Sequence, residues 1–294
     1  MKRLTLILLA LLLPLGALAD QPQPRVAALS WEITEHLLQL GITPVTVADA
    51  PDYRAWVVRP TLPAEVPNAG TRTEPNLELL AQLRPDLIAI TPLLEDIRDR
   101  LERIAPVVVY GDFTQQRDNL ALQRENFLDL AHRLGRTAQA EHRLTAMEAR
   151  IADLRQQVRR HFGGSPPALA VIRFASPTAV FINGPNSMPE HAMSLLGLRQ
   201  AYPVPVARWG NIQAPVTTLG QITQGAVLYL EPFPQRDRLF RTHLWQQMPF
   251  VRAQRFAAMQ STWTHGGVFC VEYLAEAISD ALLTLPGADL STAR

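Results

Sequence analysis

An arginine and a tryptophan lie on one long irregular stretch of this chain, between residues 52 and 80. Arg72 belongs to the segment GTRTEPN (70–76), where a glycine and a proline restrict the backbone on either side, directly before a helical pattern at 77–83. Trp56 lies upstream in the same stretch. A guanidinium donates to anionic oxygens and an indole covers apolar surface. The pair predicts a site for a ligand with both features; a solvated surface arginine is the alternative.

Further tryptophans, arginines and polar side chains follow predicted strands. Ligand sites in open α/β sheets lie beyond the carboxyl ends of the strands, so we expect these side chains to border one cleft. They are Trp31, Arg173, Arg208, Trp209, Asn211, Trp263 and His265. Trp245 is different, because its neighbours Met248 and Phe250 predict a core position.

The elements that must position these residues alternate along the chain. Apolar runs are separated by helical patterns, which is typical of parallel strands covered on both faces. In the first part of the chain the predicted strands are 25–29, 45–48, 87–90 and 107–110. After a Gly- and Pro-rich break at 163–167 the predicted strands are 169–173, 180–182, 227–230 and 256–259, before a last helix at about 267–285.

One long helix separates the two series. Residues 137–160 contain neither Gly nor Pro and repeat apolar residues every three or four positions, which predicts a helix of roughly 36 Å. We therefore expect an α/β fold of two lobes with central, mostly parallel sheets, joined by one long rigid α-helix. The lobes would span 20–136 and 163–294, with the connecting helix at 137–162. A cleft between them would close only a little.

The first nineteen residues have the pattern of a secretory signal peptide. Two basic residues precede an apolar run that is short for a membrane anchor, and Ala17-Leu18-Ala19 is a small-x-small cleavage site. Cleavage removes two of the 28 basic residues and none of the 27 acidic ones, so the mature charge is −1. This balance argues against a nucleic-acid partner. We expect a soluble monomer in the periplasm.

Catalytic and metal-binding motifs are not evident. The chain contains no G-x-S-x-G or H-E-x-x-H motif and no histidine pair at metal-ligand spacing. Of the seven histidines only His265 is expected in the cleft, while His132 and His142 fall on helical patterns with solvated positions and His191 is ambiguous. The single cysteine, Cys270, is expected to be a buried, inert thiol.

Nearly the whole mature chain resembles the periplasmic ferrichrome-type binding proteins, which capture hydroxamate siderophores for iron(III) ABC importers. The segments that carry the resemblance are RVAAL (25–29), GI (41–42), DYRAW (52–56), RTEPNLE (72–78), GPNS (184–187) and LWQQMPFVR (244–252). The resemblance implies the two-lobe fold and no enzymatic activity. It also implies that Arg72 bonds the oxygens of the iron centre and that Trp56, Trp209 and Trp263 pack the organic shell. The siderophore itself holds the iron, so no intrinsic cofactor or metal cage is expected.

The sequence departs from the family pattern at positions where aromatic residues are usual. Ile90 and Leu94 replace a Trp and a Tyr, and His265 replaces a further aromatic. Arg173 and Arg208 would meanwhile add positive charge. We therefore hypothesise a ligand more anionic than ferrichrome, such as a mixed citrate-hydroxamate siderophore.

The resemblance also implies docking to an inner-membrane ABC permease, which works with its ATPase, through one surface acid on each lobe. Glu78 occupies the first-lobe position, and Glu190 is the weaker candidate on the second lobe. Other iron chelates, cobalamin or haem are alternative ligands. A secreted hydrolase is the alternative from another class.

Overall fold

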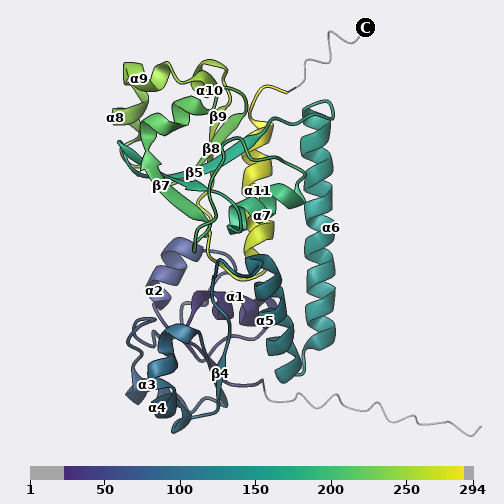
Figure 1. The fold of residues 1–294 in the computed structure, drawn as a ribbon. Coiled ribbons are helices and arrows are strands. Elements are labelled where there is room, and N and C mark those ends of the chain that lie inside the picture. The colour runs from purple at the N-terminus through teal and green to yellow at the C-terminus, as the bar shows by residue number, and fades with distance from the viewer. Residues whose placement is uncertain (1–22, 288–294) are drawn as a thin grey trace, which may run out of the picture.

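Two α/β lobes lie beside one long helix in the computed structural model, which describes residues 23–287 (Figure 1). The expected signal peptide and the residues from 288 onward lie outside this range. Within it, no helix combines the length and apolar character needed to cross a bilayer.

The first lobe contains a four-stranded parallel sheet in the order β2-β1-β3-β4. Its strands are β1 (Val26–Ala28), β2 (Thr46–Val47), β3 (Leu87–Ile90) and β4 (Val107–Val109). Val26 and Ala28 face one apolar cluster, while Ala27 and Leu29 face another. Both faces of the sheet are therefore buried, as the continuous apolar runs predicted. The helical segments are α1 (Trp31–Gln39), α2 (Ala50–Asp52), a π-helical turn (Tyr53–Val57), α3 (Leu77–Leu83), a 3₁₀ segment (Pro92–Ile97), α4 (Arg98–Glu102) and α5 (Asn119–Arg133).

The second lobe contains a five-stranded mixed sheet in the order β7-β6-β5-β8-β9. Its strands are β5 (Leu169–Ser176), β6 (Ala179–Asn183), β7 (Asn211–Pro215), β8 (Ala226–Leu230) and β9 (Phe256–Met259). Strands β5, β8 and β9 are parallel, whereas β5, β6 and β7 are antiparallel neighbours. Only two residues separate β5 from β6, too few for a parallel crossover, so a hairpin forms. Strand β7 was not expected from the sequence. The helical segments are α7 (Met188–Leu195), a 3₁₀ segment (Val216–Gln221), α8 (Arg236–Phe240), α9 (His243–Gln246), α10 (Pro249–Arg252) and α11 (Cys270–Leu283).

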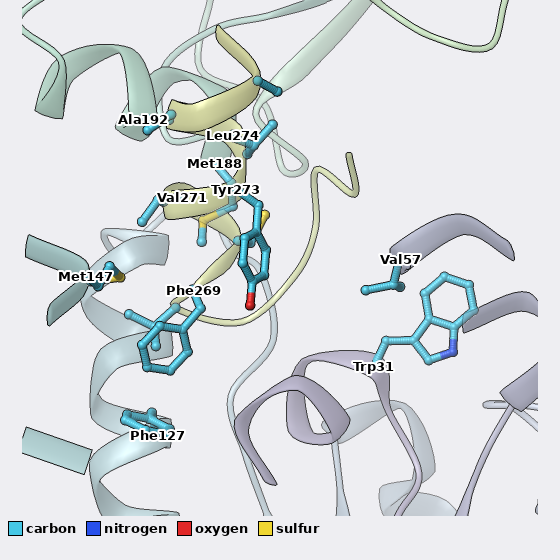
Figure 2. Close-up of a cluster of buried hydrophobic side chains, with 14 of the residues drawn as sticks. Trp31, Val57, Phe127, Met147, Met188, Ala192, Phe269, Val271, Tyr273 and Leu274 are labelled. Carbon is cyan, nitrogen blue, oxygen red and sulfur yellow. The ribbon is translucent and has the colours of Figure 1, made fainter. Parts of the chain in front are cut away.

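Helix α6 (Thr137–His161) runs along both lobes and contributes to a core that they share (Figure 1). Its apolar stripe includes Leu144, Met147 and Ile151, all buried. Figure 2 shows part of this shared core, where Phe127 of α5 meets Phe269 edge-on at a ring distance of 4.8 Å. The lobes are thus joined by continuous apolar packing as well as by the chain.

Two side chains expected in the core are buried. Trp245 is 1% exposed and contacts the ring of Phe250. Cys270 is a free, buried thiol that donates to the Trp263 carbonyl at 2.9 Å, and burial raises the pKa of the thiol. Both outcomes confirm the sequence interpretation.

A polar contact also joins the lobes, between α1 and the turn that begins α11. The Glu35 carboxylate accepts from the N–H groups of Gly267 (3.2 Å) and Phe269 (2.9 Å), and His36 Nε2 accepts from the Val268 N–H at 3.0 Å. Burial lowers the pKa of His36 to about 3 and raises the pKa of Glu35 to about 8, the latter against the backbone donors. The imidazole is therefore neutral in the folded protein.

Replacement of His36 by Gln is expected to weaken the acid sensitivity of the fold. Between pH 6.5 and 3 the unfolded chain binds a proton at His36 that the native state does not, so this residue costs up to ~1.4 kcal/mol of unfolding free energy for each pH unit of acidification. Gln still offers an oxygen to the Val268 N–H and does not titrate. Urea unfolding at pH 7 and pH 5 should show a smaller loss for His36→Gln than for the wild type.

The matched control is His132→Gln, which changes an exposed histidine of α5. The raised pKa of Glu35 acts in the opposite direction, because its contribution to the unfolding free energy falls as the pH rises from 4.5 to 8. Glu35 is present in the wild type and in both variants, so this contribution is common to the three proteins. An unchanged pH slope in His36→Gln would contradict the prediction.

Candidate functional site

A cavity of about 710 Å³ lies between the lobes at the carboxyl ends of the first sheet's strands. From the first lobe it is lined by Leu29, Ser30, Glu32, Asp49, Thr71, Arg72, Thr73, Thr91, Leu93, Asp112 and Phe113. From the second lobe it is lined by Arg173, Phe181, Asn183, Trp209, Asn211, Leu230, Trp263, Thr264 and His265. The volume and the mixture of apolar walls with a few polar groups suit a small organic ligand.

The loop that carries Arg72 is closed by its flanking residues. Gly70 and Pro75 form a β-bridge, and the Thr71 N–H donates to the Glu74 carbonyl at 3.2 Å. Gly70 has φ +92°, and a Cβ there would lie 2.7 Å from the Glu74 oxygen. Only glycine therefore fits this position. Asn76 then caps α3 by accepting from the Leu79 N–H at 3.0 Å. The backbone on either side of Arg72 is therefore restricted, as the glycine and the proline predicted.

The Arg72 guanidinium is fixed on two sides. Its Nε donates to Asp49 Oδ2 at 2.9 Å, and the Arg72 N–H donates to the same oxygen at 3.1 Å. The guanidinium carbon lies 3.9 Å from the ring centroid of Trp31. Within the described residues neither Nη atom has a hydrogen-bond partner in the protein. Two charged donors are thus held ready for oxygens of a ligand.

Trp31 has a different place from the one expected. It is 3% exposed and does not line the cavity, because it begins α1 and its Nε1 donates to the Ala48 carbonyl at 3.2 Å. The indole instead packs its ring face against the Arg72 guanidinium and meets Trp263 at a ring distance of 4.9 Å. The sequence placed Trp31 at the correct strand end but did not reveal the direction of its side chain.

Aromatic side chains from both lobes form one wall of the cavity. His265 lies 5.6 Å from Phe113, 5.6 Å from Trp209 and 5.8 Å from Trp263, measured between ring centroids. Burial and the nearby Arg173 charge lower the pKa of His265 to about 4, although a hydrogen bond at Trp209 opposes the shift. His265 is therefore a neutral ring at pH 7. Phe113 was not predicted, because nothing in the sequence marks it as more than a core residue.

Trp209 is positioned by the glycine that follows it. Gly210 has φ +68°, and a Cβ there would lie 2.5 Å from Ser187, so the loop packs directly against the start of α7. Trp209 is 43% exposed, which leaves its face open to the cavity. Asn211 lines the cavity as expected, and its Nδ2 donates to the Trp209 carbonyl at 3.3 Å.

Arg173 and Trp56 meet across the lobe boundary. Arg173 lies within β5, opposite Phe181, and not at the end of a strand as predicted. Its guanidinium carbon lies 5.6 Å from the Trp56 ring centroid. Trp56 is 40% exposed and lines a small adjoining pocket, together with Arg173, instead of the main cavity.

Three further expectations need correction. Arg208 does not line the cavity; its guanidinium lies 5.1 Å from the Trp209 ring centroid. Ile90 and Leu94 are fully buried in the first-lobe core, so they do not remove aromatic wall from the cavity. Leu93, which is 57% exposed, contributes from that segment instead.

The cavity also lacks the positive excess predicted from the sequence. Glu32 and Asp112 line it, and neither was singled out. Burial and the Asp112 charge raise the pKa of Glu32, while its backbone, Ser30 and Arg72 oppose the shift. These acids follow β1 and β4, and a search for charged residues just beyond each strand would have found both.

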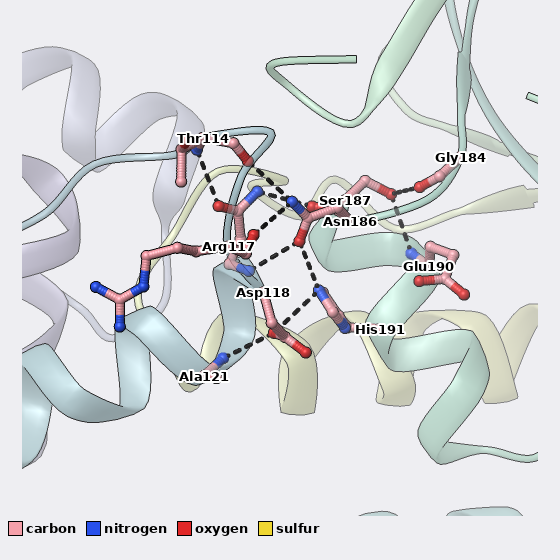
Figure 3. Close-up of polar contacts among 10 residues, drawn as sticks. Thr114, Arg117, Asp118, Ala121, Gly184, Asn186, Ser187, Glu190 and His191 are labelled. Atoms are coloured by element: carbon pink, nitrogen blue, oxygen red, sulfur yellow. Dashed lines mark hydrogen bonds and ion pairs between the residues drawn. The ribbon is translucent and has the colours of Figure 1, made fainter. Parts of the chain in front are cut away.

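Asn186 holds the loop that carries Asp112 and Phe113 against the second lobe (Figure 3). Its Oδ1 accepts from the Asn119 N–H at 2.8 Å, and its Nδ2 donates to the carbonyls of Thr114 (2.9 Å) and Arg117 (2.8 Å). The Asn119 side chain donates back to the Asn186 carbonyl at 2.9 Å. We call this set of contacts the Asn186 clasp.

Two neighbours of the clasp have separate roles. Ser187 caps α7 by accepting from the Glu190 N–H at 3.1 Å, so the GPNS segment (184–187) ends in a helix-start turn. His191, ambiguous in the sequence, has its Nε2 3.6 Å from Asp118 Oδ1 and 3.4 Å from Asn186 Oδ1. It supports the clasp and lies outside the cavity lining.

Replacement of Asn186 is expected to destabilise the protein in two separable steps. Asn186→Gly removes the side-chain hydrogen bonds and should cost about 1–3 kcal/mol of unfolding free energy. Asn186→Ala loses the same bonds and adds roughly 1 kcal/mol, because Asn186 has φ +66° and alanine disfavours this region. Urea midpoints of the two variants measure both steps, and a glycine variant as stable as the wild type would contradict the role of the clasp.

The comparison with known proteins agrees with this architecture. A family model described as "Periplasmic binding protein" matches residues 26–262, which is most of the chain. The chain belongs to this family. Among curated relatives, the Escherichia coli iron(3+)-hydroxamate-binding protein FhuD is 31% identical over 260 residues, with 88% of this chain and 86% of that protein covered. The achromobactin-binding periplasmic protein of Dickeya dadantii is 30% identical, with 90% and 88% covered.

A solved structure extends the similarity to the fold. The siderophore-binding protein FhuD from Vibrio cholerae, with Fe3+-Desferal bound, is 39% identical and superposes with a TM-score of 0.85. The match covers 89% of this chain and 98% of that one. The family resemblance and the two-lobe α/β fold expected from the sequence are thereby confirmed.

Proposed function

We propose that this protein captures an iron(III)-hydroxamate siderophore in the interlobe cavity and delivers it to an inner-membrane ABC transporter. The observation that carries the proposal is the fixed Arg72 guanidinium, which lines a 710 Å³ cavity with an aromatic wall and whose two Nη groups have no partner among the described residues. Hydroxamate oxygens around iron bear partial negative charge and accept from such donors. The siderophore supplies the ligands of the iron, and the protein binds it without chemical turnover.

The aromatic wall suits the organic part of such a ligand. Trp209, Trp263 and neutral His265 offer flat, weakly polar surfaces that cover a siderophore backbone while water is excluded. Similarity to proteins named for hydroxamate and Desferal binding supports the same ligand class. Close approach of the coloured ferric complex to Trp209 and Trp263 would also quench tryptophan fluorescence by energy transfer, which gives a direct assay.

A ferric citrate-type ligand is the second candidate, because a relative named for ferric dicitrate binding is 25% identical over 88% of this chain. Glu32 and Asp112 weaken this candidate, since they place negative charge in the same cavity. The charge argument from sequence, which relied on Arg173 and Arg208, no longer favours a mixed citrate-hydroxamate ligand.

Arg72→Ala is expected to lower the affinity for a ferric hydroxamate siderophore by about 10- to 100-fold, because hydrogen bonds from a charged donor to ligand oxygens are lost. Arg72→Lys should lose less, since one cation remains but the fork of donors does not. Fluorescence titration of wild type, both variants and the exposed-residue control Arg100→Ala measures the effect.

The same titration with ferric dicitrate, haem and cobalamin tests the ligand class. A thermal shift should accompany binding, since ligand at 100 times its dissociation constant stabilises by about 2.7 kcal/mol. Tighter binding of haem or cobalamin than of any ferric hydroxamate would overturn the proposal.

Delivery to a transporter requires an accessible docking surface in the compartment outside the inner membrane. We place the mature protein in the periplasm after cleavage near Ala19, with Glu78 as the first-lobe contact to basic residues of the permease. Glu78 is exposed in the first turn of α3 and forms no ion pair within the described residues. Glu190 is half-buried beside the Asn186 clasp and has less surface to offer.

Glu78→Ala is expected to reduce uptake of the ferric siderophore in cells without a change in binding affinity. The matched control is Glu141→Ala, an exposed acid on α6. Transport of radioactive iron and fluorescence titration together separate docking from binding. Normal uptake by the Glu78→Ala protein would remove this residue from the docking surface.

A further inference from the structure

Charged side chains are unevenly distributed along the first-lobe edge of the cavity. The strand order β2-β1-β3-β4 fixes the sequence of side chains at the carboxyl ends. The Arg72–Asp49 pair lies beside β2, Glu32 follows β1, Thr91 follows β3 and Asp112 follows β4. The edge therefore runs from an ion pair at one end to two unpaired acids, with Thr91 between the two acids in strand order.

The two acids lack a cationic partner. Neither Glu32 nor Asp112 forms a salt bridge within residues 23–287, whereas Asp49 is paired with Arg72 at 2.9 Å. Asp112 accepts only from the Phe113 N–H, at 2.6 Å through Oδ1. The mutual repulsion contributes to the raised pKa of Glu32. The Arg72 charge opposes this shift, but Arg72 is already paired with Asp49, so neither Glu32 nor Asp112 has an ion-pair partner of its own among the described residues.

Thr91 provides an independent sign of a missing partner. The residue is only 8% exposed, yet it lines the cavity. Its hydroxyl forms no hydrogen bond with the described residues, and it does not cap the 3₁₀ segment that it precedes. A hydroxyl group on a nearly buried cavity-lining residue that has no partner in the protein is available to a group of the ligand.

We propose that the corner formed by Glu32, Thr91 and Asp112 binds a cationic amine on the siderophore, while Arg72 binds the oxygens of its iron centre. An ammonium group has three donors and no acceptor, which matches two carboxylates and one hydroxyl. The preferred ligand is then a hydroxamate siderophore with a pendant primary ammonium. This inference rests on the proposed function and refines its ligand class.

The remaining charges of the cavity are compatible with this division. Arg173 lies on the second lobe beside Trp56 and adds positive charge away from the first sheet, and His265 is neutral at pH 7. Of the three acids that line the described cavity, Asp49 is paired with Arg72, whereas Glu32 and Asp112 are in no ion pair with a described residue.

A matched pair of ligands tests the proposal. Ferric desferrioxamine B ends in a primary ammonium, and its N-acetyl derivative carries a neutral acetamide at the same place. Wild-type protein at pH 7.5 should bind the ammonium form about tenfold more tightly, as expected for one charge-assisted contact. Glu32→Gln and Asp112→Asn should each lower the affinity for the ammonium form severalfold to tenfold and leave the acetylated form unchanged. Thr91→Val should act in the same direction with a smaller effect.

The control is Asp99→Asn, an exposed acid of α4 outside the cavity, which should bind both ligands as the wild type does. Unfolding midpoints confirm that each variant is folded; removal of one repelling charge should not lower them. Equal wild-type affinity for both ligands, or a loss of equal size on both in the corner variants, would overturn the inference alone. Failure of both ferric complexes to bind would instead overturn the proposed function.

Discussion

The contact between α1 and the turn before α11 fixes the relation of the two lobes. Glu35 and His36 project from a first-lobe helix and accept three backbone N–H groups of residues 267–269. The contact depends on Gly266 and Gly267, because a Cβ at Gly266 would lie 2.7 Å from Glu35 Oε2 and one at Gly267 would lie 2.4 Å from His36 Nε2. Trp263, Thr264 and His265 directly precede this turn, so the same contact sets the second-lobe wall of the cavity.

The cavity is therefore largely formed before any ligand enters. Apolar packing continues from one lobe to the other through α6 and α11, and the Asn186 clasp holds the loop of Asp112 and Phe113. Arg72 is held by Asp49 and by the Trp31 face. Binding then costs little ordering of side chains, which favours affinity over adaptability. A preformed cavity with charges at fixed places selects ligands by charge placement as well as by shape.

The sequence predicts the elements well because their patterns are local. The strand runs, the helix at α6 and the Gly70–Pro75 loop all follow from residue type and spacing. What it cannot supply is side-chain direction and the pairing of distant segments. Trp31 turns inward because the Ala48 carbonyl and Arg72 receive it, and both contacts join separate parts of the chain.

Strand pairing was also not predictable from local patterns, as the β5–β6 hairpin and the unexpected strand β7 show. Arg173 was placed at a strand end because the apolar run stops there, yet β5 continues to Ser176. Glu32 and Asp112 were overlooked because a lone acid near a helix start has many ordinary explanations. Only the fold shows that they share a cavity wall.

The Asn186 clasp has a mechanical consequence. A hinge motion needs an axis about which one body turns freely, and any attachment away from that axis must stretch. Here loop 114–119, helix α1 and Arg59, which pairs with Glu276 of α11 at 2.9 Å, attach three separate first-lobe segments to the rest of the molecule. We expect these attachments to restrict opening of the cavity by thermal motion. If the proposed delivery takes place, contact with the transporter would have to loosen them before the ligand can leave.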